Sequence, residues 1–239
     1  MMTKLDESKF KPLFGTWWEK IKPFFLSGGF DPIYEYLKKE AKRGKVIVPS
    51  SANTFRCFIE TPIDDVMVVM CGISPYHTLR GTKIIADGLL MGCSLTGYMQ
   101  PSLKIFYETI ENEMYRGEYF VKNPDVRYLC KQGVLMFNAS LTTEARKAGR
   151  HLSIWEPFIK YLFEDVLSVM GVPVIFLGKD AAELKKYLFW THIFEISHPA
   201  SAAYTNSDWN TEGAFKLVNK FLEERHNTEI KWLDMPDVF

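Results

Sequence analysis

The sequence lacks the cysteine and histidine patterns that build metal or cluster sites. Its four cysteines form no Cys-x-x-Cys pair and have no clustered histidine partners; they are Cys57, Cys71, Cys93 and Cys130. Zinc and iron–sulfur sites need such clustered ligands. We therefore expect no metal and no cofactor, and the apolar neighbours of these cysteines predict buried free thiols.

Long apolar runs and an excess of one charge are lacking too. No apolar run reaches the roughly 18 residues of a membrane-spanning helix, and the start, Met1-Met2-Thr3-Lys4-Leu5-Asp6, has no apolar signal-peptide core. These absences predict a cytoplasmic protein that does not bind membranes. Lys plus Arg and Asp plus Glu both number 29. Any basic surface for nucleic acid must therefore be local.

The sequence does contain enough apolar residues for a substantial core. Of its 239 residues, 47% are hydrophobic and 15% aromatic, which suits one α/β domain over residues 1–239. Strand patterns are predicted at 66–71, 134–137, 172–177 and 193–196, and helix patterns at 31–42, 101–114, 154–169, 181–187 and 211–224. Strands that alternate with helices imply a central four-stranded parallel sheet flanked by helices, with right-handed crossovers.

Three polar residues stand where predicted strands end. Ser74 and His198 follow strands, and Asn138 comes directly after one. Ligands of parallel sheets bind beyond the carboxyl ends of the strands. We therefore expect these three distant residues to converge on one pocket.

The loop after the first of these strands reads Gly72-Ile73-Ser74-Pro75-Tyr76-His77. It resembles the catalytic loop Gly-Gln-Asp-Pro-Tyr-His of the uracil-DNA glycosylases, with Ile73 and Ser74 in place of Gln and Asp. Other segments resemble further blocks of that family in the same order: Met99-Gln100-Pro101-Ser102-Leu103, residues 132–142, Trp155-Glu156-Pro157-Phe158 and Ser197-His198-Pro199-Ala200-Ser201. The resemblance covers most of the chain and implies the family's fold, a DNA partner and hydrolysis at a flipped base.

The resemblance also implies roles for the residues that face the base. His198 matches the histidine that donates a hydrogen bond to O2 of the departing pyrimidine, and Asn138 matches the amide that reads the base. Tyr76 matches the residue that packs against C5, Met91 falls where the family stacks a Phe, and Ile73 lies beside them. The residues alone leave other readings open: a loop-capping His198, an Asn138 that only ends its strand, and a Met91 that packs in the core.

The residues expected to contact DNA are His77, Pro101, Ser102, Ser201, Ala202 and Tyr204. Pro101 and Ser102 lie in the loop that resembles the family's phosphate-holding loop, and His77 orients its own loop or a phosphate. Ala202 falls near the family's leucine wedge, which fills the gap left by the flipped base. Tyr204 is the alternative wedge.

Ser74 is the main departure from the family. The acid that normally stands there orients the attacking water and stabilises the cationic sugar, whereas a neutral hydroxyl does only the first. Related branches of the superfamily carry Asn in a Gly-Ile-Asn-Pro pattern and remain glycosylases, so the loss of the acid is compatible with activity. Asp87 is a candidate substitute acid, although a solvated loop acid is the alternative interpretation.

Together these features predict a monomeric, metal-free DNA glycosylase that releases a pyrimidine and leaves an abasic site. The segment 78–87 differs in length from the family's usual connection, and Met91 replaces a flat stacking wall. We therefore expect a modified pyrimidine as substrate, such as a 5-substituted or glucosylated hydroxymethylcytosine of phage DNA, in a role of antiviral defence. The alternatives are a divergent uracil-repair glycosylase and a catalytically weak DNA-binding module.

Overall fold

Four parallel strands form the central sheet of the computed structural model, which describes residues 3–189, 192–205 and 207–235. They are β2 (Val68–Gly72), β5 (Val134–Asn138), β7 (Val174–Leu177) and β8 (Ile193–Ile196), in the spatial order β5-β2-β7-β8. Strands β2, β5 and β7 are buried along their whole length, as expected of strands covered on both faces. The predicted α/β fold around a four-stranded parallel sheet is confirmed.

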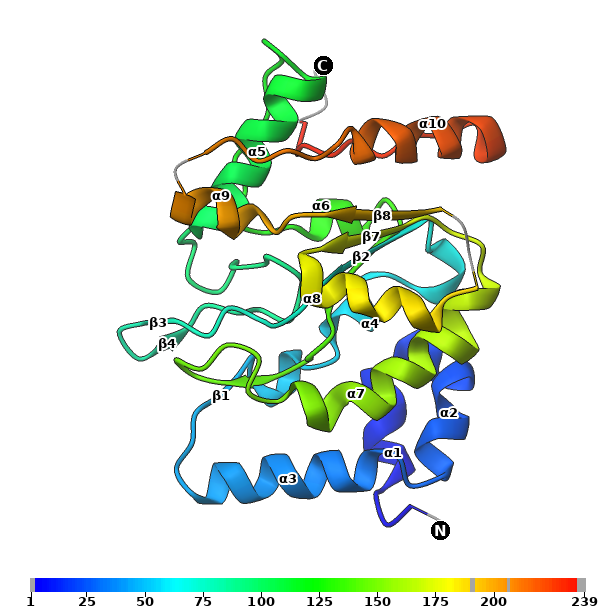
Figure 1. The fold of residues 1–239 in the computed structure, drawn as a ribbon. Helices are drawn as coiled ribbons and strands as arrows, with labels where there is room; N and C mark the ends of the chain where they lie inside the picture. The colour runs from blue at the N-terminus through cyan, green and yellow to red at the C-terminus, as the bar shows by residue number, and fades with distance from the viewer. Residues whose placement is uncertain (1–2, 190–191, 206, 236–239) are drawn as a thin grey trace.

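The register of this sheet brings the strand ends together. Gly72 of β2 lies opposite Asn138 of β5, and Leu177 of β7 lies opposite Ile196 of β8. Because all four strands run in the same direction, their carboxyl ends share one edge, which faces left in Figure 1. The loops that follow the strands therefore start from neighbouring positions.

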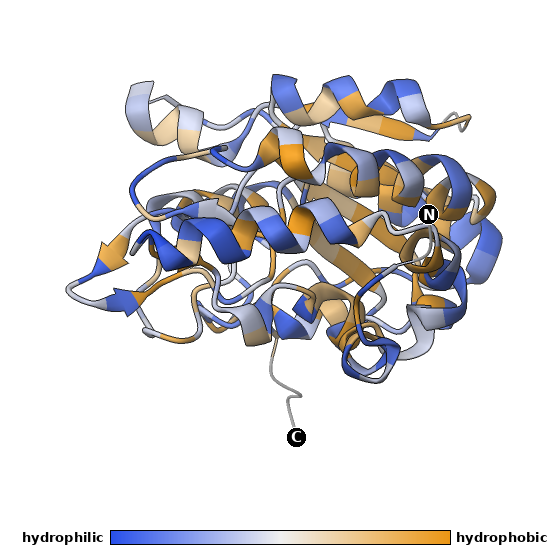
Figure 2. Ribbon diagram, turned by 90° about the horizontal axis from the view of Figure 1, so that it is seen from below, coloured by the Kyte–Doolittle hydropathy of each residue, from blue (hydrophilic) through white to orange (hydrophobic). Residues whose placement is uncertain are grey.

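Helices cover both faces of the sheet. Figure 1 shows α5 (Pro101–Met114) and α10 (Ala214–His226) on one side, and α2 (Trp18–Leu26), α3 (Phe30–Lys42) and α7 (Leu152–Tyr161) on the other. The shorter helices are α1 (Glu7–Phe10), α4 (Arg56–Glu60), α6 (Arg127–Cys130), α8 (Lys179–Ala182) and α9 (Pro199–Thr205). In Figure 2 the strands inside are hydrophobic, while the helices around them also carry hydrophilic residues. This distribution is that of amphipathic helices on a buried sheet.

Two small antiparallel pairs lie outside the main sheet. Strand β1 (Ile47–Val48) pairs with β6 (Thr143–Glu144), and β3 (Leu79–Arg80) pairs with β4 (Lys83–Ile84). The second pair is a hairpin inside the segment 78–87. Figure 1 shows it projecting beyond the edge of the sheet where the strands end.

Aromatic side chains fill the layer between the amino-terminal helices and α7. Phe158 of α7 lies 5.4 Å from Phe24 and 5.0 Å from Phe30, measured between ring centroids. Phe14 lies 5.4 Å from Phe58 in the same cluster. Burial of large aromatic rings contributes strongly to core stability. The high aromatic content of the sequence therefore serves this layer.

The predicted helices agree with the structure in place but not always in form. Those at 31–42, 101–114 and 211–224 correspond to α3, α5 and α10. The predicted helix 154–169 is wrong as one helix, because α7 gives way to a π-helical turn (Leu162–Val166) and a 3-10 turn (Leu167–Val169). The helix predicted at 181–187 is split between α8 and a 3-10 turn (Glu183–Tyr187).

The cysteines are free and buried, as predicted. Burial raises the pKa of the Cys93 thiol to about 11 and that of Cys130 to about 12, because a buried thiolate loses its hydration. Within the described ranges, no helix is both long and apolar enough to cross a membrane.

Candidate active site

The loops that follow β2 and β5 are held together by backbone hydrogen bonds. The amide of Ala139 donates to the carbonyl of Gly72 at 2.8 Å, and the amide of Ser140 donates to that of Ile73 at 2.9 Å. These bonds continue the strand pairing beyond the sheet. The loop that begins at Ile73 therefore leaves the sheet in a fixed direction.

A cavity of about 480 Å³ lies beyond these strand ends. It brings together ten of the residues that the sequence predicted for the site: Ile73, Ser74, Tyr76, His77, Met91, Pro101, Ser102, Asn138, His198 and Tyr204. Its remaining lining residues were not predicted; they are Pro75, Thr78, Leu90, Gln100, Ala148, Ala200 and Ala203. Segments that are distant in the sequence thus meet at the edge where parallel sheets bind ligands.

His198 is held as a neutral hydrogen-bond donor. Its Nδ1 accepts a hydrogen bond of 3.1 Å from the amide of Ala200 at the start of α9. An accepting Nδ1 carries no proton, so in the neutral ring the proton is on Nε2. Burial lowers the pKa of His198 to about 4, because a buried imidazolium is poorly solvated. At neutral pH, His198 therefore presents an uncharged Nε2–H.

Asn138 presents an amide that is not engaged within the protein. The side chain is 5% exposed, lines the cavity and has no hydrogen-bond partner among the residues that the structure describes. A Cβ at its neighbour Gly72 would lie 2.5 Å from Cδ1 of Leu90 and 3.0 Å from Oδ1 of Asn138, so the glycine leaves room for both side chains. The amide is therefore free to bind a ligand in the cavity, with both a donor and an acceptor.

Ser74 is positioned by a segment far away in the sequence. Its Oγ accepts a hydrogen bond of 3.0 Å from the amide of Gly149. The amide of Arg146 donates to the carbonyl of His77 at 2.7 Å, so the same segment supports both ends of the loop. The Ser74 hydroxyl keeps its own hydrogen and one lone pair for a further partner, such as a water molecule.

Tyr76 is fixed in place by Ser102. Their hydroxyl oxygens lie 2.6 Å apart, and Ser102 is 2% exposed at the start of α5. Burial raises the pKa of Tyr76 well above its usual value, although the hydrogen bond to Ser102 opposes this shift. The ring is therefore a neutral wall of the cavity with one defined position.

The chain is similar to known proteins over most of its length. The model of the uracil DNA glycosylase superfamily matches residues 58–223. A uracil-DNA glycosylase of Francisella tularensis is 31% identical over 221 residues, which are 90% of this chain and 94% of the relative. One of Pseudomonas aeruginosa is 31% identical over 231 residues, which are 93% of this chain and 95% of the relative. The chain belongs to the uracil DNA glycosylase superfamily.

A solved structure shows the same fold. The crystal structure of the mimivirus uracil-DNA glycosylase superposes with a TM-score of 0.78 at 22% identity, covering 97% of this chain and 94% of the other. The predicted membership of this superfamily of DNA glycosylases is thereby confirmed.

Asp87 does not line the cavity. Both interpretations from the sequence, a substitute catalytic acid and a solvated loop acid, are therefore wrong. It is 0% exposed, so it is not a solvated loop acid. Its oxygens accept hydrogen bonds from the amides of Leu89 and Ser94, each at 3.1 Å, and from Oγ of Ser94 at 2.6 Å. Arg56 pairs with it at 3.3 Å. A carboxylate with all these partners holds its loop and is not free to activate water.

The packing of helix α9 also shows that one predicted DNA contact, at Ala202, is wrong. Ala202 is 5% exposed, so it cannot act as a wedge. Oγ of Ser201 donates to the carbonyl of His198 at 2.7 Å, which ties the helix start to the histidine loop. Tyr204 is 88% exposed while lining the cavity. Of the two candidate wedges, only Tyr204 is available to DNA.

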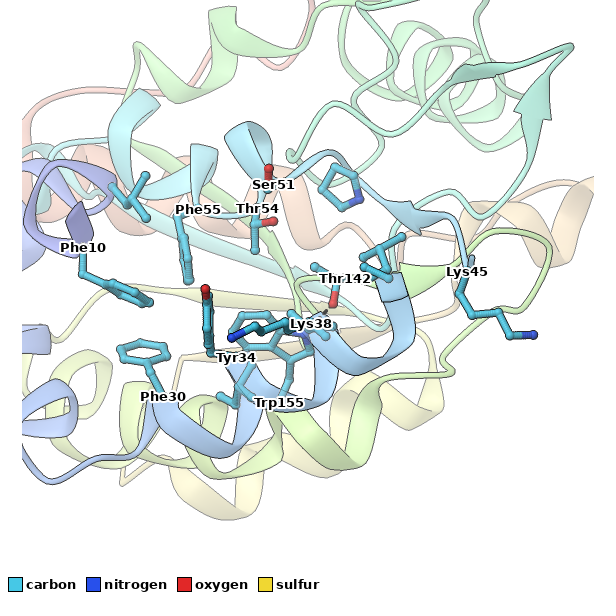
Figure 3. A pocket seen from close by; sticks show the side chains of 16 residues that line it. Phe10, Phe30, Tyr34, Lys38, Lys45, Ser51, Thr54, Phe55, Thr142 and Trp155 are labelled. Atoms are coloured by element: carbon cyan, nitrogen blue, oxygen red, sulfur yellow. Dashed lines mark hydrogen bonds between the residues drawn. The ribbon is translucent and has the colours of Figure 1, made fainter. Parts of the chain in front are cut away.

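A second cavity, of about 540 Å³, lies between α3 and the segment that follows β1. Figure 3 shows the rings of Phe30, Tyr34 and Phe55 gathered around it. Several of its polar groups are already used: Thr142 Oγ1 accepts from Nε1 of Trp155 at 2.8 Å, and Lys45 pairs with Glu144 at 3.2 Å. It is lined by none of Ser74, Asn138 and His198. The candidate site is therefore the cavity around Asn138 and His198.

The protonation state of His198 leads to a prediction about pH. Base release should stay level from about pH 7 to about pH 5 and fall only as the pH approaches the pKa of about 4. The pKa of His198 in the folded protein also lies below the unfolded value of about 6.5. The unfolded chain therefore binds a proton first, and folding stability falls as pH drops from about 6.5 to about 4. Single-turnover rates and urea midpoints across this range test both effects.

His77 lines the same cavity, so it serves as the control for this experiment. His77→Gln should leave the acid limb in place, whereas His198→Gln, which retains a donor but cannot titrate, should remove it. An acid limb centred near about 6.5 in the native protein would contradict a neutral, buried His198.

Proposed function

We propose that this chain is a DNA glycosylase that hydrolyses the N-glycosidic bond of a flipped pyrimidine and leaves an abasic site. The observation that carries the proposal is that one cavity contains both the neutral Nε2–H of His198 and the unengaged amide of Asn138. The C1′–N bond breaks with its electron pair going to the base. His198 then stabilises the charge that develops on the base oxygen, and Asn138 holds the base edge.

Water then attacks C1′ of the sugar and forms the C1′–O bond, and the proton that it gives up neutralises the released base anion. Ser74 is the polar side chain on the catalytic loop that we propose orients this water, through the hydroxyl hydrogen and lone pair that Gly149 leaves free. None of the described residues that line the cavity is Asp or Glu. The enzyme therefore works without a carboxylate beside the cationic sugar, which we expect to cost rate.

Uracil is the base that we propose first. The hydroxyl of Tyr76 is tied to Ser102 at 2.6 Å, so its ring is a rigid wall. A rigid wall against C5 accepts a hydrogen there and opposes larger groups. The two bacterial relatives described above are also named uracil-DNA glycosylases.

A 5-substituted pyrimidine, with the role in antiviral defence expected from the sequence, is the second candidate. Met91 favours it, because a flexible side chain lines the cavity where a flat ring would limit the shape of the base. Product analysis distinguishes both candidates from a DNA-binding module without activity, since only a glycosylase produces abasic sites.

His198→Ala and Asn138→Ala should each slow base release about 10²–10³-fold, because each removes a hydrogen bond to the transition state worth about 2.7–4 kcal/mol. Single-turnover excision from a uracil-containing oligonucleotide measures the effect. The controls are His226→Ala and Asn210→Ala, which change the same residue types at exposed positions outside the cavity. Near-native rates for both cavity variants would overturn the assignment of the site.

Ser74→Asp should raise uracil excision by roughly tenfold or more. The amide of Gly149, now 3.0 Å from Oγ, would donate to the new carboxylate and favour its ionised form. Ser74→Asn is the uncharged control and should show no comparable gain. Equal rates for the two variants would mean that charge at this position does not limit the reaction.

The native enzyme should favour uracil over thymine by about 10–200-fold in kcat/KM, which is the range for one methyl-sized group in a fitted pocket. Tyr76→Ala should reduce this preference by removing the wall against C5. Tyr119→Ala, at a residue 77% exposed, is the control and should not change it. Faster cleavage of a 5-hydroxymethylcytosine substrate than of uracil would instead support the second candidate.

A further inference from the structure

The β3–β4 hairpin ends in a tip that is surrounded by solvent. Leu79 pairs with Ile84 and Arg80 with Lys83, which leaves Gly81 and Thr82 as the two-residue turn. Gly81 adopts φ +61°, and a Cβ added there would meet no described atom within 4 Å. The tip is thus held by its own strands and not by packing against the body of the protein.

Two cations stand directly opposite each other on this hairpin. Arg80 and Lys83 are both exposed and form one cross-strand pair. Like charges in this arrangement destabilise a hairpin. Neither forms an ion pair with any acidic side chain in the described part of the chain. The guanidinium of Arg80 instead lies over the ring of Tyr98, 4.8 Å from its centroid. An anion from outside the protein would relieve the repulsion.

The hairpin lies beside the mouth of the candidate active site. Thr78, directly before β3, lines the cavity, and so does Gln100, two residues after Tyr98. Arg146 and Arg150 are exposed on the segment that supports the catalytic loop, and they too form no ion pair with a described residue. In a chain with no net charge, these four cations therefore lie on the two segments that contribute Thr78 and Ala148 to the cavity.

We propose that the β3–β4 hairpin is a DNA-backbone clamp in which Arg80 and Lys83 bind phosphates of the strand next to the flipped nucleotide. This inference rests on the proposed function, since it takes the substrate to be DNA. Arg suits this task because its planar fork matches phosphate oxygens while its face stacks on Tyr98. Such contacts position the enzyme on DNA without reading the sequence.

Salt dependence of binding tests the clamp. The probe is a duplex with a tetrahydrofuran abasic analogue, which the enzyme cannot cleave. The double variant Arg80→Gln/Lys83→Gln should reduce the slope of log Kd against log salt concentration by about 1.8, or about 0.9 for each lost phosphate contact. The rate of base release at saturating enzyme should stay native, because neither side chain lines the cavity. Arg80→Lys, which keeps the charge, should retain most of the slope.

The matched control is Lys220→Gln/Arg225→Gln on α10. This pair also combines a lysine with an arginine stacked on a ring, Arg225 lying 5.0 Å from the centroid of Phe221, and Figure 1 shows α10 far from the hairpin. Thr82→Glu is a second variant; it keeps both cations and should weaken binding by adding a negative charge at the tip. Thermal melts verify that each variant folds.

The outcomes separate the clamp from the proposed function. A reduced slope in the hairpin variant alone supports the clamp, even if the native protein releases no base and the proposed function fails. A native slope in the hairpin variant, in a protein that excises uracil normally, overturns the clamp and leaves the function standing. Equal losses in hairpin and α10 variants would indicate a general charge effect and would also overturn it.

Discussion

The register between β2 and β5 is the constraint on which the candidate site depends. It sets Gly72 beside Asn138, and the bonds from Ala139 and Ser140 carry the alignment into the catalytic loop. A slip of one residue would turn every side chain of a strand to the opposite face. The Asn138 amide would then leave the cavity, and Ser74 would lose its position opposite Gly149. The positions of Asn138 and Ser74 in the site are therefore set by this register.

The cavity works with dipoles more than with charges. Among its described lining residues there is no carboxylate, and burial keeps His198 neutral, with its pKa lowered to about 4. Fixed dipoles in a poorly solvated site stabilise developing charge effectively, because they need not reorganise during the reaction. In the proposed function, the departing base is stabilised in this way, but the cationic sugar is not. Under that proposal, the missing acid at Ser74 affects one half of the transition state only.

The sequence predicts the parts of the site that are adjacent along the chain. Strand patterns locate the strand ends, and the Pro-Tyr-His and His-Pro blocks follow them directly. It does not predict contacts between distant segments. Ser74 and Gly149 are 75 residues apart, and Arg56 and Asp87 are 31 apart. Asp87 looks like a loop acid in the sequence because nothing local shows that Arg56 and Ser94 will surround it. Ala202 is similar, since only the packing of α9 hides it.

In the proposed function, specificity depends on two walls of the cavity, Tyr76 and Met91, which differ in stiffness. The Tyr76 wall is fixed by Ser102, whereas Met91 is an adaptable side chain in a loop held by Asp87. Met91 has the left-handed φ of +58°, which is uncommon for a residue with a side chain. The hydrogen bonds of Asp87 to Leu89 and Ser94 span the turn that contains Met91. If Met91 is the wall on which the base stacks, as proposed, the buried acid contributes to the pocket by fixing the backbone of that wall, while the side chain stays adaptable.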